Sequence, residues 1–232
     1  MIQLDAQVKI GQLVAECPAA ARLFERLGID YCCGGRHTLR EACLARGLDE
    51  EELLSELRGV LQEPCEADLP GMDLAELTDY IVSLHHGYLR DTLPLLARQV
   101  ERVAAVHGAR RPELLEVRNL FQEFVSEMTD HMEKEEQILF PMIAGLAEGG
   151  PAFSLSRIIE VMEAEHDSAG QALAGMRRLT NGYVVPEGAC TTYRAVLQGL
   201  AELEEATYIH VHAENHILFP RALAMEDLKQ GS

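Results

Sequence analysis

The sequence contains no tryptophan, few aromatic residues (5%), and only 20 lysines and arginines against 38 aspartates and glutamates. A net charge of −18 gives no basic surface to neutralise phosphates, which argues against nucleic acid and against an anionic bilayer as partners. No apolar run reaches the ~18 residues of a membrane span. The first residues also lack the basic start and apolar core of a signal peptide. We therefore expect a cytoplasmic protein that binds neither nucleic acid nor membrane.

The six cysteines follow no regular framework, and no pair of them has Cys-x-x-Cys spacing. A chain of 232 residues buries enough surface to fold without covalent staples, so we expect thiols rather than structural disulfides. Only the adjacent pair Cys32 and Cys33 is unusual. Because Gly34 and Gly35 follow this pair directly, we expect residues 30–35 to form an exposed turn.

Proline, glycine and acidic residues concentrate at 62–72, which predicts a linker between a small helical domain at 1–61 and a larger domain at 73–232. In the small domain, one helical pattern covers about 10–27 and ends at a glycine suited to a left-handed cap.

Two further helices are expected in the small domain. One begins after Thr38, which stands three residues before Glu41, as in a capping box. The other covers about 49–60.

The larger domain has the pattern of four long helices with few segments of strand-like alternation, so the predicted fold is all-α. Short joints between long helices favour an up-down four-helix bundle. The expected helices run from Asp73 to His107, from Pro112 to about Gly145, from Ser154 to about Asn181, and from Pro186 to about Ala224. A joint at 149–151 separates the second helix from the third.

An internal repeat places histidine and glutamate at matching positions. The segments His131–Pro141 and His210–Pro220 both read H-x-x-x-E-[EN]-x-I-L-F-P, 79 residues apart, and His86 and His166 precede them with a spacing of 80 residues. Side chains four residues apart share a helix face, so each repeat presents an imidazole and a carboxylate in one direction. Two such hairpins, related by a pseudo-twofold axis, would bring six side chains to one centre.

These six side chains fall on apolar seams of the predicted bundle, where His86 fits better than its neighbour His85. The seam of the second helix contains Val117, Phe121, Phe124, Met128, His131, Glu135, Ile138 and Met142. A single seam histidine is usually a hydrogen-bonded core residue, and a single seam glutamate can pair with arginine. Two buried carboxylates with no seam lysine or arginine at their level would each cost several kcal/mol, which metal cations would offset. The pattern therefore predicts a metal site with these ligands: His86, His131, Glu135, His166, His210 and Glu214.

The type of ligand indicates the metal. A set without thiolates excludes a cysteine-type structural zinc site, and imidazole with carboxylate favours iron over manganese or zinc. Four histidines and two glutamates are too few for two saturated octahedra. Carboxylates that bridge two metals would leave positions open for a small ligand. Two ferrous ions with two carboxylates also leave room for an oxo or hydroxo bridge.

The repeat, together with His86 and His166, resembles a hemerythrin-like di-iron domain. The added module with Tyr31-Cys32-Cys33-Gly34-Gly35 resembles that of the repair-of-iron-centres family, the ScdA-type iron–sulfur cluster repair proteins. The segments 135–143 and 165–170 are also similar to that family. The resemblance implies a non-haem centre of two iron ions, with oxo or hydroxo bridging, held by the four histidines and by Glu135 and Glu214 as bridges.

The resemblance further implies that the chain restores iron–sulfur clusters damaged by nitric oxide or peroxide, as an iron donor rather than an enzyme. Its partners would be iron–sulfur client proteins, its small ligands nitric oxide or dioxygen, and its assembly a homodimer. Two alternatives stay open: an enzyme that reduces nitric oxide or dioxygen at the same centre, and a sensor or store of these gases.

Cys32 and Cys33 could simply be small buried residues of a tight turn. We instead expect their thiols to have a redox or other thiol role, since exposed adjacent thiols could ligate iron, accept nitric oxide or form a strained vicinal disulfide. Glu165, next to His166, could line a path to the centre, but on its spacing we expect it to face solvent. Four histidines fall off the seams and are interpreted as surface or hydrogen-bonded residues: His85, His107, His212 and His216.

Overall fold

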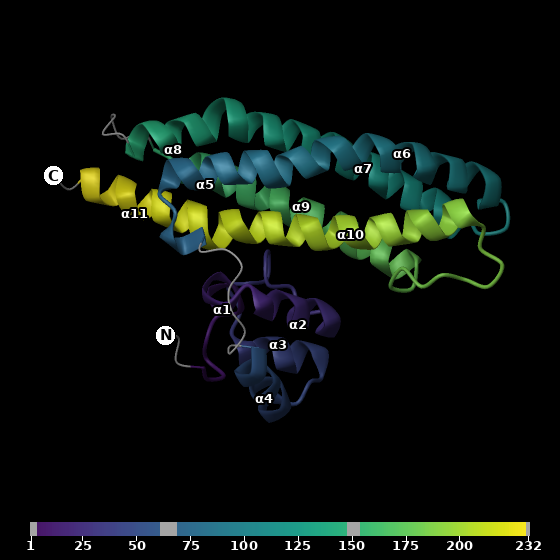
Figure 1. Ribbon diagram of the computed structural model, residues 1–232, viewed down its shortest axis with the longest axis horizontal. Helices are drawn as coiled ribbons and strands as arrows, with labels where there is room; N and C mark the ends of the chain where they lie inside the picture. Colours follow the sequence, from purple (N-terminus) through teal and green to yellow (C-terminus); the bar gives the residue numbers. More distant parts are fainter. Residues whose placement is uncertain (1–3, 61–68, 148–153, 231–232) are drawn as a thin grey trace. The chain divides into compact units, whose positions relative to one another are not determined.

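The computed structural model describes residues 4–60, 69–147 and 154–230. Apart from one isolated bridge between Lys9 and Thr38, these residues contain no β-structure. The helices are drawn in Figure 1. The prediction of an all-α fold is therefore confirmed.

Helices α1–α4 occupy the N-terminal part of the chain, with bounds Ile10–Glu16, Ala19–Leu27, Leu39–Arg46 and Glu50–Val60. A short 3₁₀ turn (η1, Leu69–Gly71) follows. The remaining α-helices are α5 Leu74–Tyr80, α6 Gly87–His107, α7 Glu113–Lys134, α8 Phe140–Ala147, α9 Ser156–Leu179, α10 Thr191–Ala213 and α11 Phe219–Gln230. Within the described ranges, three π-helical turns join consecutive α-helices: η2 Ile81–His86, η3 Glu135–Leu139 and η4 Glu214–Leu218.

The four long helices α6, α7, α9 and α10 form the predicted bundle (Figure 1). Their inward faces are apolar, as the seams predicted, and include Leu93, Phe121, Leu173 and Leu200, each almost fully buried. The bundle buries its apolar stripes against one another because each amphipathic helix is stable only when its apolar face is covered.

The predicted helix over about 10–27 is instead two helices, α1 and α2. Cys17 leaves helical geometry (φ −141°, ψ 87°), and Pro18 stands at the N-cap of α2. Proline disfavours helical geometry in the residue before it and cannot donate a helical hydrogen bond, which explains the break. The predicted end of the pattern is confirmed, since Gly28 takes a left-handed φ of 67°.

Two helices begin with a capping box, and the one at Thr38 is a box that the sequence predicted. The Thr38 hydroxyl accepts the Glu41 N–H at 3.2 Å, and the Glu41 carboxylate accepts the Thr38 N–H at 2.7 Å. At the start of α5, the Asp73 carboxylate accepts the Glu76 N–H at 2.8 Å, and the Glu76 carboxylate accepts the Asp73 N–H at 3.1 Å. Each box satisfies two of the backbone donors that a helix start leaves without an intrahelical acceptor.

The π-helical turns change the predicted seam. In η3 the Phe140 N–H donates to the Glu135 carbonyl, five residues back, so the turn holds one residue more than an α-turn. The seam predicted Ile138 inside, but Ile138 is 50% exposed and Leu139 is buried in its place. The strict 4-3 alternation was therefore wrong beyond Glu135.

The N-terminal helices fall into one compact unit with residues 143–147, 154–156 and 208–230. Their own core is apolar and contains Leu13, Phe24, Leu39 and Leu57, with the Tyr208 side chain packed against it. The tip of α10 and the segments η4 and α11 are therefore structural neighbours of α1–α4.

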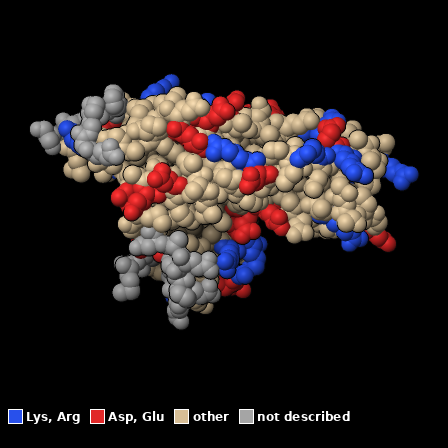
Figure 2. Space-filling model, turned by 45° about the horizontal axis from the view of Figure 1, so that its top comes forward, with Lys and Arg blue, Asp and Glu red and all other residues tan. Residues whose placement is uncertain are grey.

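Residues 62–68 of the predicted linker at 62–72 lie outside the described residues, as does the whole predicted joint at 149–151. The predicted domain bounds at 1–61, 62–72 and 73–232 stay predictions. Among the described residues, no helix combines the length and apolar character that a membrane span requires. Acidic and basic side chains are interspersed over the face of the molecule drawn in Figure 2.

Candidate metal centre

All six predicted ligands are buried. The repeat positions the first histidine–glutamate pair at the junction of α7 and η3 and the second at the junction of α10 and η4, while η2 ends at the first seam histidine. Each of the six residues is at most 1% exposed: His86, His131, Glu135, His166, His210 and Glu214. Buried charges are tolerated only with a compensating partner, so these positions are chemically demanding.

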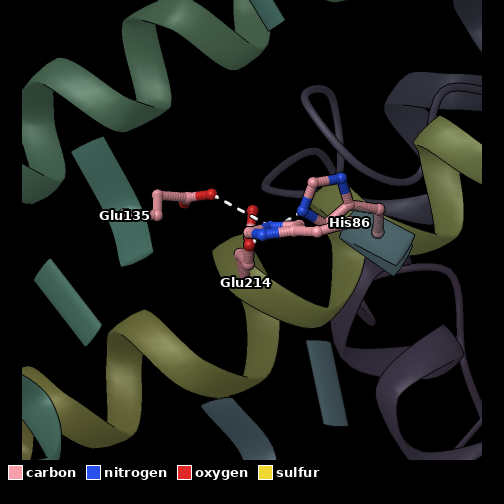
Figure 3. Close-up of side chains that lie close together, drawn as sticks. His86, Glu135 and Glu214 are labelled. Atoms are coloured by element: carbon pink, nitrogen blue, oxygen red, sulfur yellow. Dashed lines mark hydrogen bonds and ion pairs between the residues drawn. The ribbon is translucent and has the colours of Figure 1, made fainter. Parts of the chain in front are cut away.

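In the bundle, the histidines turn the same ring atom towards one carboxylate. The Nε2 atoms of His86 and His131 both lie 3.3 Å from Oε2 of Glu135. The Nε2 atom of His166 lies 2.9 Å from that of His131. Figure 3 shows His86 and Glu135 joined in this way, and it also labels Glu214. Three imidazole nitrogens and a carboxylate oxygen therefore converge.

The second pair repeats this arrangement within one helix. Nε2 of His210 lies 2.9 Å from Oε1 of Glu214, four residues later. In η4 the Phe219 N–H donates to the Glu214 carbonyl, as Phe140 does to Glu135 in η3. The two halves of the repeat thus share the local backbone geometry as well as the residue pattern.

Two further carboxylates bind the Nδ1 atoms of two of these histidines. Nδ1 of His86 lies 2.6 Å from Oε1 of Glu136, and Nδ1 of His131 lies 2.9 Å from Oε2 of Glu165. A carboxylate that accepts from Nδ1–H fixes the tautomer and leaves the Nε2 lone pair for a metal ion. The expectation that Glu165 faces solvent was therefore wrong, because its carboxylate reaches a seam histidine.

Basic side chains support these two carboxylates at the surface. Arg90 donates to Glu136 at 2.6 Å, and Lys134 donates to Glu165. The hydrogen bond from His131 and then the contact with Lys134 lower the pKa of Glu165 to about 2, against the opposing effect of burial. Burial would raise the pKa of Glu136, but the hydrogen bonds from Arg90 and His86 lower it overall. Glu136 was missed from the sequence, although its place directly after a ligand was a usable signal.

The donor set fits metal ions. Two groups of four buried side chains could each hold one ion: His86, Glu135, His210 and Glu214, and His131, Glu135, His166 and Glu214. Nitrogens at right angles around a metal, with bonds of about 2.1 Å, lie about 3.0 Å apart, close to the 2.9 Å between His131 and His166. Glu135 and Glu214 belong to both groups.

The cysteine pair is not the exposed turn that the sequence predicted. Tyr31 and Cys32 are almost fully buried, and Cys33 is partly buried. The Nε2–H of His216 donates to the Cys32 carbonyl at 2.7 Å, and the Tyr31 ring packs edge-on against His212 at 5.6 Å between ring centres. The chain after Tyr208, far away in the sequence, covers the turn and explains the difference.

The carboxylate of Asp30 organises the turn. Its Oδ1 accepts the backbone N–H of Cys32 at 3.1 Å and that of Cys33 at 3.0 Å, and it also accepts the Cys32 thiol at 3.2 Å. The two sulfurs are 3.8 Å apart and form no disulfide. Burial, followed by the contacts with Cys33 and Asp30, raises the pKa of the Cys32 thiol well above its ordinary value, so this thiol is protonated at neutral pH.

The four histidines off the seams have varied surroundings. His85 and His212 are buried, and the His85 ring packs edge-on against Tyr80. Burial and then the nearby charge of His216 lower the pKa of His212 to about 3. His107 contacts the Cys190 sulfur at 3.4 Å. His216 is the residue with an evident connection to the motifs, because it binds the cysteine turn from a position two residues after Glu214.

Comparisons with known proteins agree with this geometry. Residues 77–222 match the model of the hemerythrin HHE cation binding domain. Residues 6–61 match the ScdA_N model, described as a domain of unknown function (DUF542). The chain is 39% identical over 220 residues to the iron-sulfur cluster repair protein YtfE of Shigella boydii serotype 4 (strain Sb227), covering 94% of this chain and 97% of the relative. The same values hold for YtfE of Escherichia coli O139:H28 (strain E24377A / ETEC) and of Escherichia coli strain K12 / DH10B.

Proposed function

Since the chain belongs to the hemerythrin-domain family of iron–sulfur cluster repair proteins, we propose that it restores damaged iron–sulfur clusters with iron from its buried histidine–glutamate centre. The observation that carries this proposal is the convergence of imidazole nitrogens on the buried carboxylate of Glu135. Iron is the metal that suits a set of imidazoles and carboxylates without thiolates.

We propose two iron ions, bridged by Glu135 and Glu214. One group supplies His86 and His210, and the other supplies His131 and His166, with both carboxylates common to the two. Bound iron would supply redox and Lewis-acid chemistry at this place. The chain itself holds the Nδ1 protons of His86 and His131 through Glu136 and Glu165, and the burial of all six proposed ligands excludes water.

The two carboxylates that bind the ligand histidines from outside favour a centre that releases iron over one that stores it permanently. Glu136 and Glu165 each bind both a ligand histidine and a surface cation, and both are partly exposed. A change at the surface can therefore reach the Nδ1 atoms of His86 and His131 directly. Outer partners of this kind typically change metal affinity by about 10–100-fold, which is the scale needed to release an ion.

The proposal includes the partners and the setting. The clients are iron–sulfur proteins damaged by nitric oxide or peroxide in the cytoplasm, and the thiols of Cys32 and Cys33 take part in the repair. Nitric oxide and dioxygen are the small ligands expected at the open metal positions. A homodimer is the expected assembly.

The first test is the metal content of the chain purified from iron-supplied cells, with the absorption spectrum of its oxidised form. We expect two irons per chain and the absorption of an oxo-bridged ferric pair. His131→Ala should lower the iron content, whereas His37→Ala, at an exposed histidine outside the set, should leave it unchanged. One zinc ion, or no metal in the wild type, would contradict the proposed centre.

The second test is repair itself. An iron–sulfur enzyme inactivated by nitric oxide is mixed with the iron-loaded chain, and the return of cluster absorption and of enzyme activity is followed. Recovery should require the loaded chain and consume its iron. Catalytic consumption of nitric oxide with an added reductant, without recovery of the client, would replace repair by a reductase function.

A further inference from the structure

We propose that Asp30, Cys32 and Cys33 form a second metal site, which takes a single ferrous ion on its way from the histidine–glutamate centre to a client. This inference rests on the proposed function and deepens it, because it names where the supplied iron is held by thiolates. One ligand atom from each residue lies within 4.8 Å of the others.

The spacing of the sulfurs carries the argument. A tetrahedral metal with bonds of about 2.3 Å to sulfur separates two sulfur ligands by about 3.8 Å. The Sγ atoms of Cys32 and Cys33 are 3.8 Å apart, and Oδ1 of Asp30 is 3.2 Å from Sγ of Cys32. A disulfide would require the sulfurs to approach to about 2 Å. The observed turn therefore offers three ligand atoms to one ion without a change in sulfur spacing.

The tight backbone of the turn requires glycine at both positions that follow the cysteines. A Cβ atom at Gly34 would lie 2.8 Å from the Asp30 carbonyl oxygen, and one at Gly35 would lie 2.3 Å from the Tyr31 carbonyl oxygen. Asp30 is held in turn by the N–H groups of Cys32 and Cys33. The motif Cys-Cys-Gly-Gly is thus explained by a turn that folds back tightly on the carboxylate preceding it.

The chemistry of the site favours a divalent, thiophilic cation. The two S–H bonds break, each sulfur donates its electron pair to the ion, and two protons leave to solvent, with no change in oxidation state. Two thiolates and a carboxylate then surround the ion with three negative charges. Because Asp30 and Cys33 are only partly buried, a fourth position is accessible from outside, where a client thiolate can enter and take the ion over.

A direct structural link joins this turn to the other centre. His216 binds the Cys32 carbonyl from η4, the π-turn that begins with Glu214. The His216 ring also fills the space beside two glycines, since a Cβ atom at Gly11 or Gly35 would lie 2.5 Å or 2.2 Å from its atoms. The position of the turn and that of Glu214 are therefore set by the same short segment.

The test is a titration of the reduced, iron-loaded full-length chain with Co²⁺ as the probe. A thiolate bound to Co²⁺ gives a sulfur-to-cobalt charge-transfer band in the near ultraviolet. The histidine–glutamate centre contains no sulfur and gives no such band even if cobalt enters it. We expect the band to saturate at one cobalt per chain, with release of about two protons per ion.

Matched variants assign the band. Cys32→Ser with Cys33→Ser should abolish it, and Asp30→Asn should weaken cobalt binding by roughly tenfold or more. Cys190→Ser, at an exposed cysteine elsewhere, should leave the band unchanged. Circular dichroism and the iron content report whether each variant has folded.

The outcomes separate this inference from the proposed function. Two irons per chain without a cobalt–sulfur band, or a band that survives in the double serine variant, would overturn the thiolate site alone. A band that depends on Cys32 and Cys33 in a chain that never holds iron at the histidines would support the site and contradict the proposed function.

Discussion

The contact between Gly11 and His216 gives a quantitative prediction about the connection between α1 and η4. A Cβ atom at Gly11 would lie 2.5 Å from Cε1 and Nδ1 of the His216 ring, closer than real contacts allow. Gly11 lies in α1 with helical backbone, so alanine is otherwise compatible with the position. Replacement of Gly11 by alanine therefore has two opposing effects on the free energy of unfolding: the steric clash lowers it, and the higher helix propensity of alanine raises it.

The expected magnitudes follow from these two effects. Overpacking a tight contact costs about 1–3 kcal/mol, and alanine gains up to about 1 kcal/mol over glycine in a helix. Gly11→Ala should therefore lower the free energy of unfolding by about 1 kcal/mol in the wild type. In a His216→Ala background the clash is absent, and the same change should raise it by up to about 1 kcal/mol.

The assay is urea denaturation of the four proteins of this double-mutant cycle, followed by circular dichroism. The coupling between the two substitutions should be about 1–3 kcal/mol, within the range known for residues in contact. Gly59→Ala is a matched control, because no atom lies within 4 Å of its added Cβ in helix α4. It should stabilise both backgrounds equally. Equal effects of Gly11→Ala in the two backgrounds would refute the claim that His216 occupies this space.

Three further predictions concern the centre, the thiols and the fold. Glu135→Ala with Glu214→Ala should abolish binding of the second metal ion, and a variant that keeps two irons per chain by elemental analysis would contradict the bridging assignment. Cys32→Ser with Cys33→Ser should leave the iron content intact while lowering client repair; a collapse of the iron content would instead place the thiols in the main centre. Thr38→Ala should lower the free energy of unfolding by about 1 kcal/mol in urea, because it removes the acceptor of the capping box.

The sequence predicted the bundle and its six candidate ligands because both depend on local, periodic signals. Seam positions follow from the spacing of apolar residues, and the helix starts follow from capping residues such as Asp73 and Glu76. A single seam histidine would not have indicated a metal site. The internal repeat did, since two separate segments carry the same histidine–glutamate pattern.

The errors have different physical origins. Pro18 split a helix that the apolar pattern alone had joined, and this local signal was available in the sequence. Burial of Cys32 and the contact of Glu165 with His131 depend instead on segments far apart in the chain. No pattern around residues 30–35 indicates that a histidine near position 216 will cover them. Such contacts become visible only when the packing is known.

The π-turns show why the repeat extends beyond its histidine and glutamate. Pro141 and Pro220 lack the N–H that would continue the α-helical hydrogen bonds just after the two glutamates. The preceding phenylalanines instead donate five residues back, to the carbonyls of Glu135 and Glu214. Leu139 and Leu218, each four residues after its glutamate and the last residue of its π-turn, are both fully buried. The I-L-F-P part of the motif thus has a structural role, because it sets the backbone geometry that follows each glutamate.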